Sequence, residues 1–172
     1  MRFWIDTEYY HNGRNIELIS LGAVSEDGRE FYAISTEFDA QAVKPWIKEQ
    51  VLPYLEPLSS SVWKSLSEIR QAFVAFVGDQ PAEFWSYIST NDWYLVTNLL
   101  PGGLDGLPHN WPFECWDLQQ WAFHLGNPSI PECQTEHSAL SDARWHREVY
   151  AFLSEYQHKI DRGIEVRRSA TR

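Results

Sequence analysis

The sequence predicts an α/β fold in which a mixed β-sheet is flanked by α-helices. Three short apolar segments near the N-terminus have the length and composition of strands, and later segments carry apolar residues at helical spacing. Strands that come first and helices that follow are typical of a sheet with helices on its faces. At 172 residues, the chain is long enough for one domain with a hydrophobic core.

The first segments of the chain supply the strands. Residues 2–6 predict a short buried strand, residues 17–24 a second and residues 30–35 a third. The Asp27-Gly28 step favours a hairpin between the second and third strands, because this dipeptide is typical of tight β-turns.

Helices and loops dominate the middle of the chain. Residues 43–54 contain two prolines and predict a short helix bounded by turns. Residues 61–77 predict a helix, because their apolar side chains recur at helical spacing behind serines that can cap it. Residues 83–88 predict another strand, residues 91–100 a helix, and residues 101–112, rich in glycine and proline, a loop.

The C-terminal third predicts a last strand at 115–118, a helix at 119–125 and a long final helix at 138–156. From residue 161 the chain is polar and contains four arginines. We therefore expect a single domain over residues 1–160, followed by a basic polar tail over residues 161–172.

The charge of the chain limits the partners it can bind. The formal net charge of −10 argues against a protein that tracks along duplex DNA, which needs a basic surface. It does not exclude a pocket for a short single-stranded end, because metal ions bound to carboxylates reverse the local sign of the charge. Nine Trp, nine Phe and eight Tyr indicate an aromatic core and interface more than a set of platforms for bases.

Two features predict a cytoplasmic protein that does not contact a membrane. Cys115 and Cys133 have no spacing typical of a metal site or a redox motif, so we expect reduced thiols. Asp6 and Glu8 lie where a signal peptide needs an apolar stretch, and no apolar run approaches membrane-spanning length.

Asp6 and Glu8 form the first candidate motif. Side chains two residues apart on a strand point to the same face, so both carboxylates can reach one cation and Asp6 can bridge two. An apolar strand that ends in two carboxylates suits a bound cation, which compensates for their burial. The alternative is a solvated strand end.

His137 and Asp142 form the second candidate motif. If Ser138 opens the final helix, Asp142 lies in its early turns facing the sheet, and His137 lies on the loop before it. An imidazole with an ordinary pKa of about 6.5 can serve there as a mobile general base. The alternative is an ordinary helix start with a polar loop residue.

Asp92 is the third candidate, in the first turn of a helix that directly follows a strand. From that position it can point across the sheet toward Asp6; the alternative is a carboxylate that complements the helix dipole. Hard divalent cations prefer carboxylate ligands. Two such ions about 4 Å apart can activate water and stabilise the leaving oxygen in phosphodiester hydrolysis. The order of these acids along the chain fits such a site.

The order Asp-x-Glu, mid-chain Asp and His-x-x-x-x-Asp resembles the signature of the DEDDh 3′–5′ exonucleases, which have a ribonuclease H-like fold. More narrowly, the chain resembles the polyadenylate-specific 3′-exoribonuclease group (RNase AS). The supporting segments are residues 3–8, 17–28, 45–53 and 136–144. The sequence departs from the family before Asp92, where serine and threonine replace the glycine or small apolar residues that are often found there.

The resemblance implies a role for each candidate residue. Asp6, Glu8 and Asp142 would bind one metal ion, and Asp6 would bridge to a second ion that Asp92 holds directly or through water. His137 would remove a proton from the attacking water. The backbone around Thr7 and the Leu21-Gly22 stretch would meet the terminal nucleotide, because Gly22 permits close approach.

The leading hypothesis is therefore a metal-dependent 3′–5′ exoribonuclease that uses two Mg²⁺ or Mn²⁺ ions and releases nucleoside 5′-monophosphates from the 3′ end of single-stranded RNA. The narrower resemblance implies a preference for adenine tracts and a homodimer. Two alternatives stay open, a 3′–5′ exodeoxyribonuclease acting on single-stranded DNA and an inactive RNA-binding or dimerisation module. A structural Ca²⁺ site fits poorly, because the acids come from remote segments.

Other conspicuous residues have ordinary explanations at this stage. We expect Trp4 and Trp46 to pack rather than to stack on a base, and His146 shares no spacing with the other histidines that suggests zinc. Arg144 can contact phosphate or pair with an acid, and Asp117 is a weaker candidate for supporting the site.

Overall fold

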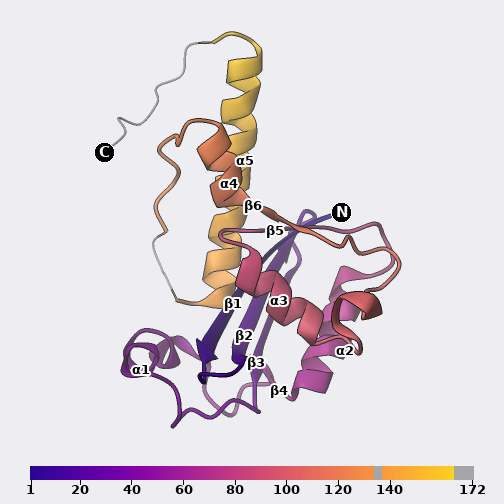
Figure 1. Cartoon of the computed structure of the whole chain (residues 1–172), viewed down its shortest axis with the longest axis vertical. Coiled ribbons are helices and arrows are strands. Elements are labelled where there is room, and N and C mark those ends of the chain that lie inside the picture. The colour runs from indigo at the N-terminus through magenta and orange to yellow at the C-terminus, as the bar shows by residue number, and fades with distance from the viewer. Residues whose placement is uncertain (134–136, 165–172) are drawn as a thin grey trace.

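The computed structural model of the chain describes residues 1–133 and 137–164. Its strands are β1 (Arg2–His11), β2 (Ile16–Ser25), β3 (Glu30–Ser35), β4 (Trp63–Lys64), β5 (Glu83–Ser86) and β6 (Cys115–Asp117). They form a six-stranded mixed sheet in the order β4-β3-β2-β1-β5-β6 (Figure 1). β1, β2 and β3 pair antiparallel, whereas β1-β5, β5-β6 and β3-β4 pair parallel. The predicted α/β fold with a mixed sheet is confirmed.

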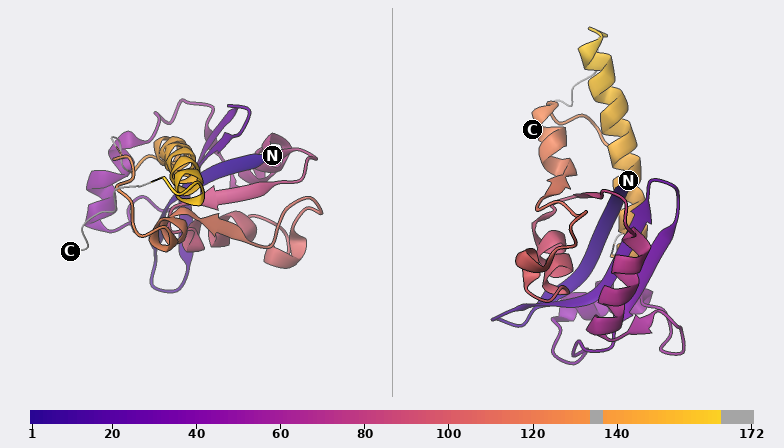
Figure 2. Two further views of the ribbon diagram at one scale, coloured as in Figure 1. Left: turned by 90° about the horizontal axis from the view of Figure 1, so that it is seen from above. Right: turned by 90° about the vertical axis from the view of Figure 1, so that its right-hand side faces the viewer.

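Helices cover the sheet on both sides (Figure 2). They are α1 (Pro45–Gln50), α2 (Leu66–Val77), α3 (Thr90–Asn98), α4 (Leu118–His124) and α5 (Ala139–Asp161), with the short 3₁₀ helices η1 (Leu52–Tyr54) and η2 (Gly103–Gly106). α5 packs across β1 and β2, and its far half projects beyond the sheet beside α4. Among the described residues, no helix combines the length and the hydropathy needed to cross a bilayer.

β1 is longer than predicted. It continues past Asp6 to His11, because its antiparallel pairing with β2 extends to the pair His11–Ile16, with one shift of register between Glu8 and Tyr9. The prediction that the strand ends at its two carboxylates is therefore wrong. Asp6 and Glu8 lie inside a strand that is held by hydrogen bonds on the β2 side, and this gives them a rigid backbone.

Side chains of β1 alternate between the two faces of the sheet, as the pleat requires. Phe3 and Ile5 face α2 and α3 and belong to the largest hydrophobic cluster. Trp4 faces α5, where its ring lies 5.3 Å from that of Tyr150, and Asp6 follows it on the same face. The alternation therefore assigns the carboxylates to the face covered by α5.

α2 begins later than predicted. Trp63 and Lys64 form β4, and the Lys64 carbonyl accepts a hydrogen bond from the Thr36 N–H. The predicted helix over 61–77 is therefore wrong for its first residues. The helix starts after Ser65, whose hydroxyl accepts from the Glu68 N–H while the Glu68 carboxylate accepts from the Ser65 N–H. This capping box fixes the start of the helix.

α5 begins at Ala139 as predicted, but it extends to Asp161, beyond the predicted end at 156. α4 contacts this extension, because the indole N–H of Trp121 donates a hydrogen bond of 2.8 Å to Gln157 Oε1. The predicted basic tail over 161–172 therefore begins within this helix. Residues 165–172 of that tail, like Glu136 in the segment before His137, lie outside the described residues.

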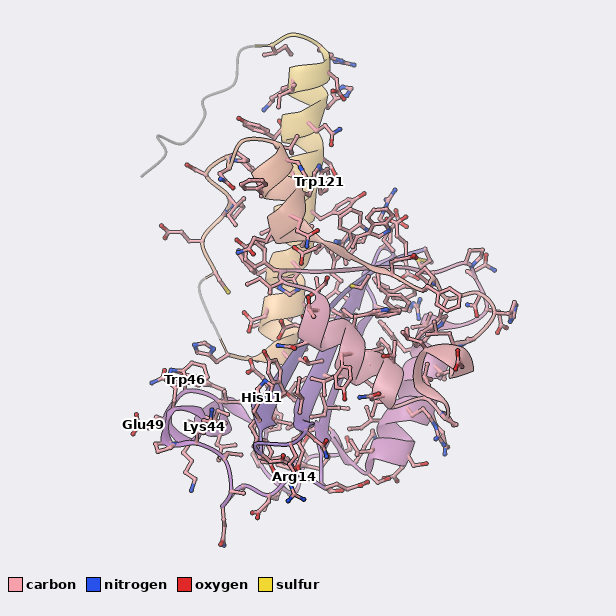
Figure 3. All side chains as sticks on the ribbon, in the orientation of Figure 1. His11, Arg14, Lys44, Trp46, Glu49 and Trp121 are labelled. Carbon is pink, nitrogen blue, oxygen red and sulfur yellow. The ribbon has the colours of Figure 1, made fainter. Side chains whose placement is uncertain are left out.

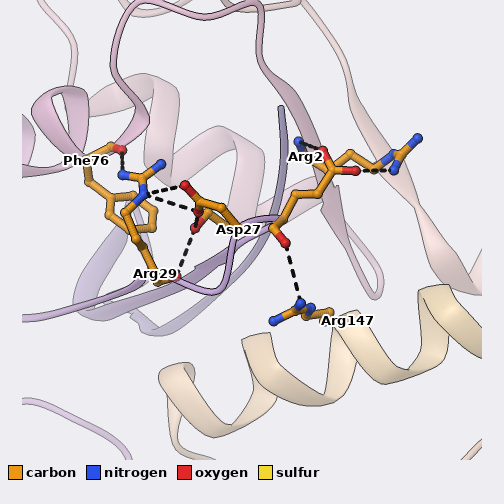
Figure 4. Close-up of polar contacts among 7 residues, drawn as sticks. Arg2, Asp27, Arg29, Phe76 and Arg147 are labelled. Atoms are coloured by element: carbon orange, nitrogen blue, oxygen red, sulfur yellow. Dashed lines mark hydrogen bonds and ion pairs between the residues drawn. The ribbon is translucent and has the colours of Figure 1, made fainter.

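Polar contacts fasten the turn between β2 and β3 to its neighbours (Figure 4). The Arg29 guanidinium pairs with Asp27 at 2.9 Å and donates to the carbonyl of Phe76 in α2. Beside it, Arg2 pairs with Glu26 in the same turn. The hairpin is thus tied to α2 and to the start of β1.

Candidate active site

Three of the predicted metal ligands converge. Asp6 and Glu8 of β1 and Asp142 of α5 each present a ligand atom, and these atoms lie within 4.8 Å of one another. They line a cavity of about 660 Å³ that also includes His137 and His146. Side chains from the two ends of the chain therefore meet in one cavity, as the sequence analysis expected.

Gly22 of β2 allows the start of α5 to lie close to the sheet. It pairs with Asp6 across the sheet, and a Cβ added to it would lie 2.2 Å from the carbonyl carbon of Ala139. The prediction that Gly22 gives a nucleotide access is therefore wrong, because the α5 backbone occupies that space. The side chain of Leu21 is fully buried in the cluster on the opposite face, so only its backbone remains a predicted contact of the nucleotide.

Asp142 is held in place by its own helix start. Its Oδ2 accepts a hydrogen bond of 3.1 Å from the N–H of Ser138, and its Oδ1 accepts one of 3.2 Å from the Cys133 thiol. Burial raises the pKa of Asp142, while the bonds from Cys133 and Ser138 act in the opposite direction. The carboxylate is thereby oriented toward the strand.

His137 lies at the rim of the cavity, directly before α5. Its backbone has a φ of 70°, a left-handed conformation that is uncommon for residues other than glycine and is often found at functional sites. Its ring meets that of Trp46 edge to face, with 4.8 Å between centroids. Trp46, which we expected to pack rather than to stack on a base, makes this contact but stays 53% exposed (Figure 3).

Asp92 reaches the site through Thr7. Its Oδ1 accepts bonds of 3.0 Å from the Thr7 N–H and 2.5 Å from the Thr7 hydroxyl, and its Oδ2 accepts one from the Ser86 hydroxyl. Burial raises the pKa of Asp92 to about 6, although these bonds oppose the shift. Asp92 is thus directed toward the strand that carries Asp6, but it is outside the group of three acids within 4.8 Å. The Thr7 donors that were predicted to meet substrate are engaged by Asp92.

The acids repel one another. The pKa of Asp6 is raised well above its ordinary value, first by burial and then by the charges of Asp92, Asp142 and Glu8. Burial and the Asp142 charge raise the pKa of Glu8 to about 8. Clustered carboxylates with these shifts fit a divalent cation, which compensates for both their burial and their repulsion.

His146 is a residue of the site that the sequence analysis missed. It is 2% exposed, its Nδ1 donates to the Ile5 carbonyl at 2.8 Å, and its Nε2 lies 3.8 Å from Asp6 Oδ1. Burial lowers the pKa of His146 to about 4, so the imidazole is neutral with Nε2 as an acceptor beside Asp6. Its position four residues after Asp142, on the same face of a helix, was the signal that could have found it.

Two of the weaker candidates have structural roles. Asp117 caps α4 by accepting a 2.9 Å bond from the Gln120 N–H, and it also accepts from the Ser89 N–H. Arg144 pairs with Glu30 at 2.7 Å on the surface. Of its two predicted roles, a phosphate contact or an ion pair with an acid, the structure has the ion pair.

The fold defines the class of protein first. It is similar to a solved structure of Escherichia coli exonuclease I in complex with a dT13 oligonucleotide, with a TM-score of 0.65, 11% identity and coverage of 94% of this chain and 42% of that chain. It is also similar to the Neurospora crassa Pan2 catalytic unit, with a TM-score of 0.52, 15% identity and coverage of 94% and 28%. The chain thus spans less than half the length of those chains. At these identities the likeness shows the fold alone, which is the predicted ribonuclease H-like nuclease fold.

The sequence then defines the family. Residues 1–154 match the model of the 3′-5′ exoribonuclease Rv2179c-like domain. The 3′-5′ exoribonucleases Rv2179c and MT2234.1, from Mycobacterium tuberculosis strains H37Rv and CDC 1551, are each 38% identical over 148 residues, which cover 84% of this chain and 88% of theirs. The chain belongs to the Rv2179c-like 3′–5′ exoribonuclease family, and the predicted enzyme class is confirmed.

Proposed function

We propose that this protein hydrolyses single-stranded RNA from its 3′ end and releases nucleoside 5′-monophosphates with the help of two divalent metal ions. The observation that carries the proposal is the cluster of Asp6, Glu8 and Asp142 beside His137 in one cavity. Membership of an exoribonuclease family supports the reaction class.

The carboxylates would hold the ions. Asp6, Glu8 and Asp142 suit one ion, and Asp6 suits a bridge to a second ion on the side of Asp92. Their oxygen ligands favour Mg²⁺ or Mn²⁺. Bound there, divalent cations supply a Lewis acid that makes water more acidic and stabilises negative charge on the leaving oxygen.

His137 would act as the general base. It accepts a proton from the water that attacks the last phosphodiester, and the bond from phosphorus to the 3′ oxygen of the preceding nucleotide breaks. The products are a nucleoside 5′-monophosphate and an RNA shortened by one nucleotide. Contact with the ring of Trp46 limits where the His137 imidazole can lie, and the bonds from Ser138 and Cys133 keep Asp142 oriented meanwhile.

A preference for adenine tracts, a homodimer and a cytoplasmic location complete the proposal. The adenine preference is supported by the resemblance to the polyadenylate-specific group. Homodimer formation is supported by large apolar side chains exposed near β6, where Phe113 is 65% and Trp116 55% exposed. Size-exclusion chromatography with light scattering should give twice the chain mass of 20.1 kDa. The mass of a monomer would remove the homodimer from the proposal.

One degradation experiment tests the reaction. Oligo(A), RNA of mixed sequence and single-stranded DNA, each labelled at the 5′ end, are incubated with Mg²⁺, Mn²⁺ or EDTA, with Asp142→Ala as the inactive control. We expect a ladder that shortens from the 3′ end with metal only, fastest on oligo(A). Faster loss of DNA would favour the exodeoxyribonuclease, and intact substrates throughout would favour the inactive binding module.

A further inference from the structure

A second groove opens next to the carboxylate cavity. It has a volume of about 290 Å³ and is lined by the end of β1 and the start of α1, with Glu8, His11, Lys44 and Trp46 among its residues. Glu8 lines both the groove and the carboxylate cavity. Trp46, Lys44 and His11 lie together at this end of the molecule (Figure 3). The groove is therefore continuous with the reaction site.

Trp46 presents its ring on a rigid support. The next residue, Ile47, is buried with Val43, Val51 and Tyr10, so α1 is fixed against the sheet while Trp46 stays 53% exposed. The rings of Trp46 and His137 meet edge to face, with 4.8 Å between their centroids. An exposed indole on a fixed helix beside a reactive centre is suited to stacking on a base, an interaction worth about 1–3 kcal/mol per base.

Lys44 gives the groove a positive charge. It is exposed at the residue before α1, and within the part of the chain that the structure describes no carboxylate forms an ion pair with it. In a chain with a net charge of −10, this ammonium group brings a positive charge to the groove and favours an anionic ligand that extends out of the carboxylate cavity. A phosphodiester backbone has that charge and that length.

We infer that this groove binds one of the two nucleosides that flank the scissile phosphate, with the base stacked on Trp46 and a backbone phosphate paired with Lys44. The inference rests on the proposed function and adds to it the residues that select and hold the RNA end. Trp46 thus has two contacts, His137 on one side and the base on its exposed face.

Binding measurements separate these two contacts. In an Asp142→Ala background, the affinity for 5′-fluorescein oligo(A) is measured by anisotropy for intact RNA and for RNA with an abasic ribose at the last, the second-to-last or the fifth-to-last position. We expect one of the last two abasic sites to weaken binding by about 5–150-fold, the equivalent of one stacked base, and the fifth-to-last site to have no such effect.

The variant Trp46→Leu should weaken binding of intact RNA by the same factor and should remove the effect of that abasic site. Trp46→Phe, which keeps an aromatic ring, should restore part of the affinity and guards against a folding artefact. Phe123→Leu is the matched control, because Phe123 is a large aromatic side chain that is 67% exposed and lies outside the groove. If the losses from Trp46→Leu and from the abasic site multiply instead, Trp46 does not contact that base and the inference is overturned.

The variant Lys44→Gln tests the phosphate contact. It should lower the slope of log affinity against log salt concentration by about 0.7, the value for one contact with a single strand. Lys48→Gln on the same helix removes the same charge outside the groove and should leave the slope unchanged; an equal change in both variants contradicts a specific contact. Failure of the proposed function gives a different result, since the parent protein would then bind these RNAs without shortening them.

Discussion

The two faces of the central sheet receive alternate side chains of β1 and use them in opposite ways. On the face under α2 and α3, Phe3 and Ile5 join a cluster of aromatic and aliphatic side chains. On the face under α5, Asp6 and Glu8 place like charges close together. Burial of apolar side chains on the first face stabilises the fold by about 1.5–3 kcal/mol each, so the sheet can carry repulsion on the second. One strand thus combines stability and chemistry without conflict.

The two faces are not independent, because Thr7 connects them. Its N–H and hydroxyl both bind the carboxylate of Asp92 in α3, while its neighbours Asp6 and Glu8 face α5. Away from this link, we expect changes on the α5 face to reduce activity without unfolding, and changes on the opposite face to reduce stability without a chemical defect.

The largest effect is expected from Asp6→Asn. The variant should lose at least about 10³-fold in rate, since metal-assisted charge stabilisation is worth several kcal/mol. Its melting temperature in EDTA at pH 8 should equal or exceed that of the parent, because a source of repulsion is removed. Steady-state rates and thermal unfolding check this. A variant that is both slow and less stable in EDTA would mean that Asp6 serves the core.

His137→Ala should reduce the rate constant of the chemical step by about 10²–10⁴-fold, as expected for the loss of a general base. Binding of RNA should change less than the rate, because His137 acts on water. Single-turnover rates together with anisotropy separate the two effects. A rate equal to that of the parent would remove His137 from the mechanism.

Phe73→Ala is the matched change on the other face. Phe73 is 1% exposed and contacts the rings of Phe31, Phe84 and Trp111. We expect a loss of about 3–5 kcal/mol in the free energy of unfolding, with an unchanged rate per folded molecule. Denaturant unfolding measures the free energy of unfolding. Active-site titration counts the active molecules, so that the rate can be expressed per folded molecule. A large change in rate with little loss of stability would contradict the division between the faces.

Metal ions should stabilise the protein more at high pH than at low pH. The pKa of Glu8 is raised from its ordinary value of 4.5 to about 8 in the folded protein. The contribution of protonated Glu8 to the free energy of unfolding is therefore fully present below pH 4.5 and is lost as the pH rises through 8. Melting temperatures in EDTA should therefore fall from pH 6.5 to 8.5. This window avoids the opposite effect of His146, which lies below pH 6.5 because burial lowers its pKa to about 4.

Mg²⁺ at 100 times its dissociation constant should raise the melting temperature by about 5–10 °C, more at pH 8.5 than at pH 6.5. Asp6→Asn should abolish most of this increase. An equal increase at both pH values would indicate that Mg²⁺ binds elsewhere.

The smallest effect is expected from Ser65→Ala, which removes the capping box of α2. The free energy of unfolding should fall by about 1 kcal/mol and the rate should stay unchanged. Ser67→Ala, in the same helix but outside the cap, is the control for the denaturation midpoint. If both substitutions have the same effect, the cap does not define the helix start.

Local patterns predicted much of this molecule. The range of β3 matched its prediction because Asp27-Gly28 sets the hairpin locally, and the shared face of Asp6 and Glu8 follows from the period of a strand. The missed features depend on contacts between distant segments. β4 exists only through its pairing with β3, and Trp46 is exposed beside His137 only because of where α1 lies on the sheet.

The contact at Gly22 has a consequence for the choice of ion. Because no side chain separates the two backbones there, α5 lies close to β2 and, through the pair Gly22–Asp6, close to the strand that carries Asp6. Mg²⁺ demands ligands at about 2.0–2.1 Å, whereas Ca²⁺ accepts about 2.3–2.6 Å. A side chain at position 22 would push α5 and its Asp142 away from Asp6, and a wider set of carboxylates would suit Ca²⁺ better than Mg²⁺.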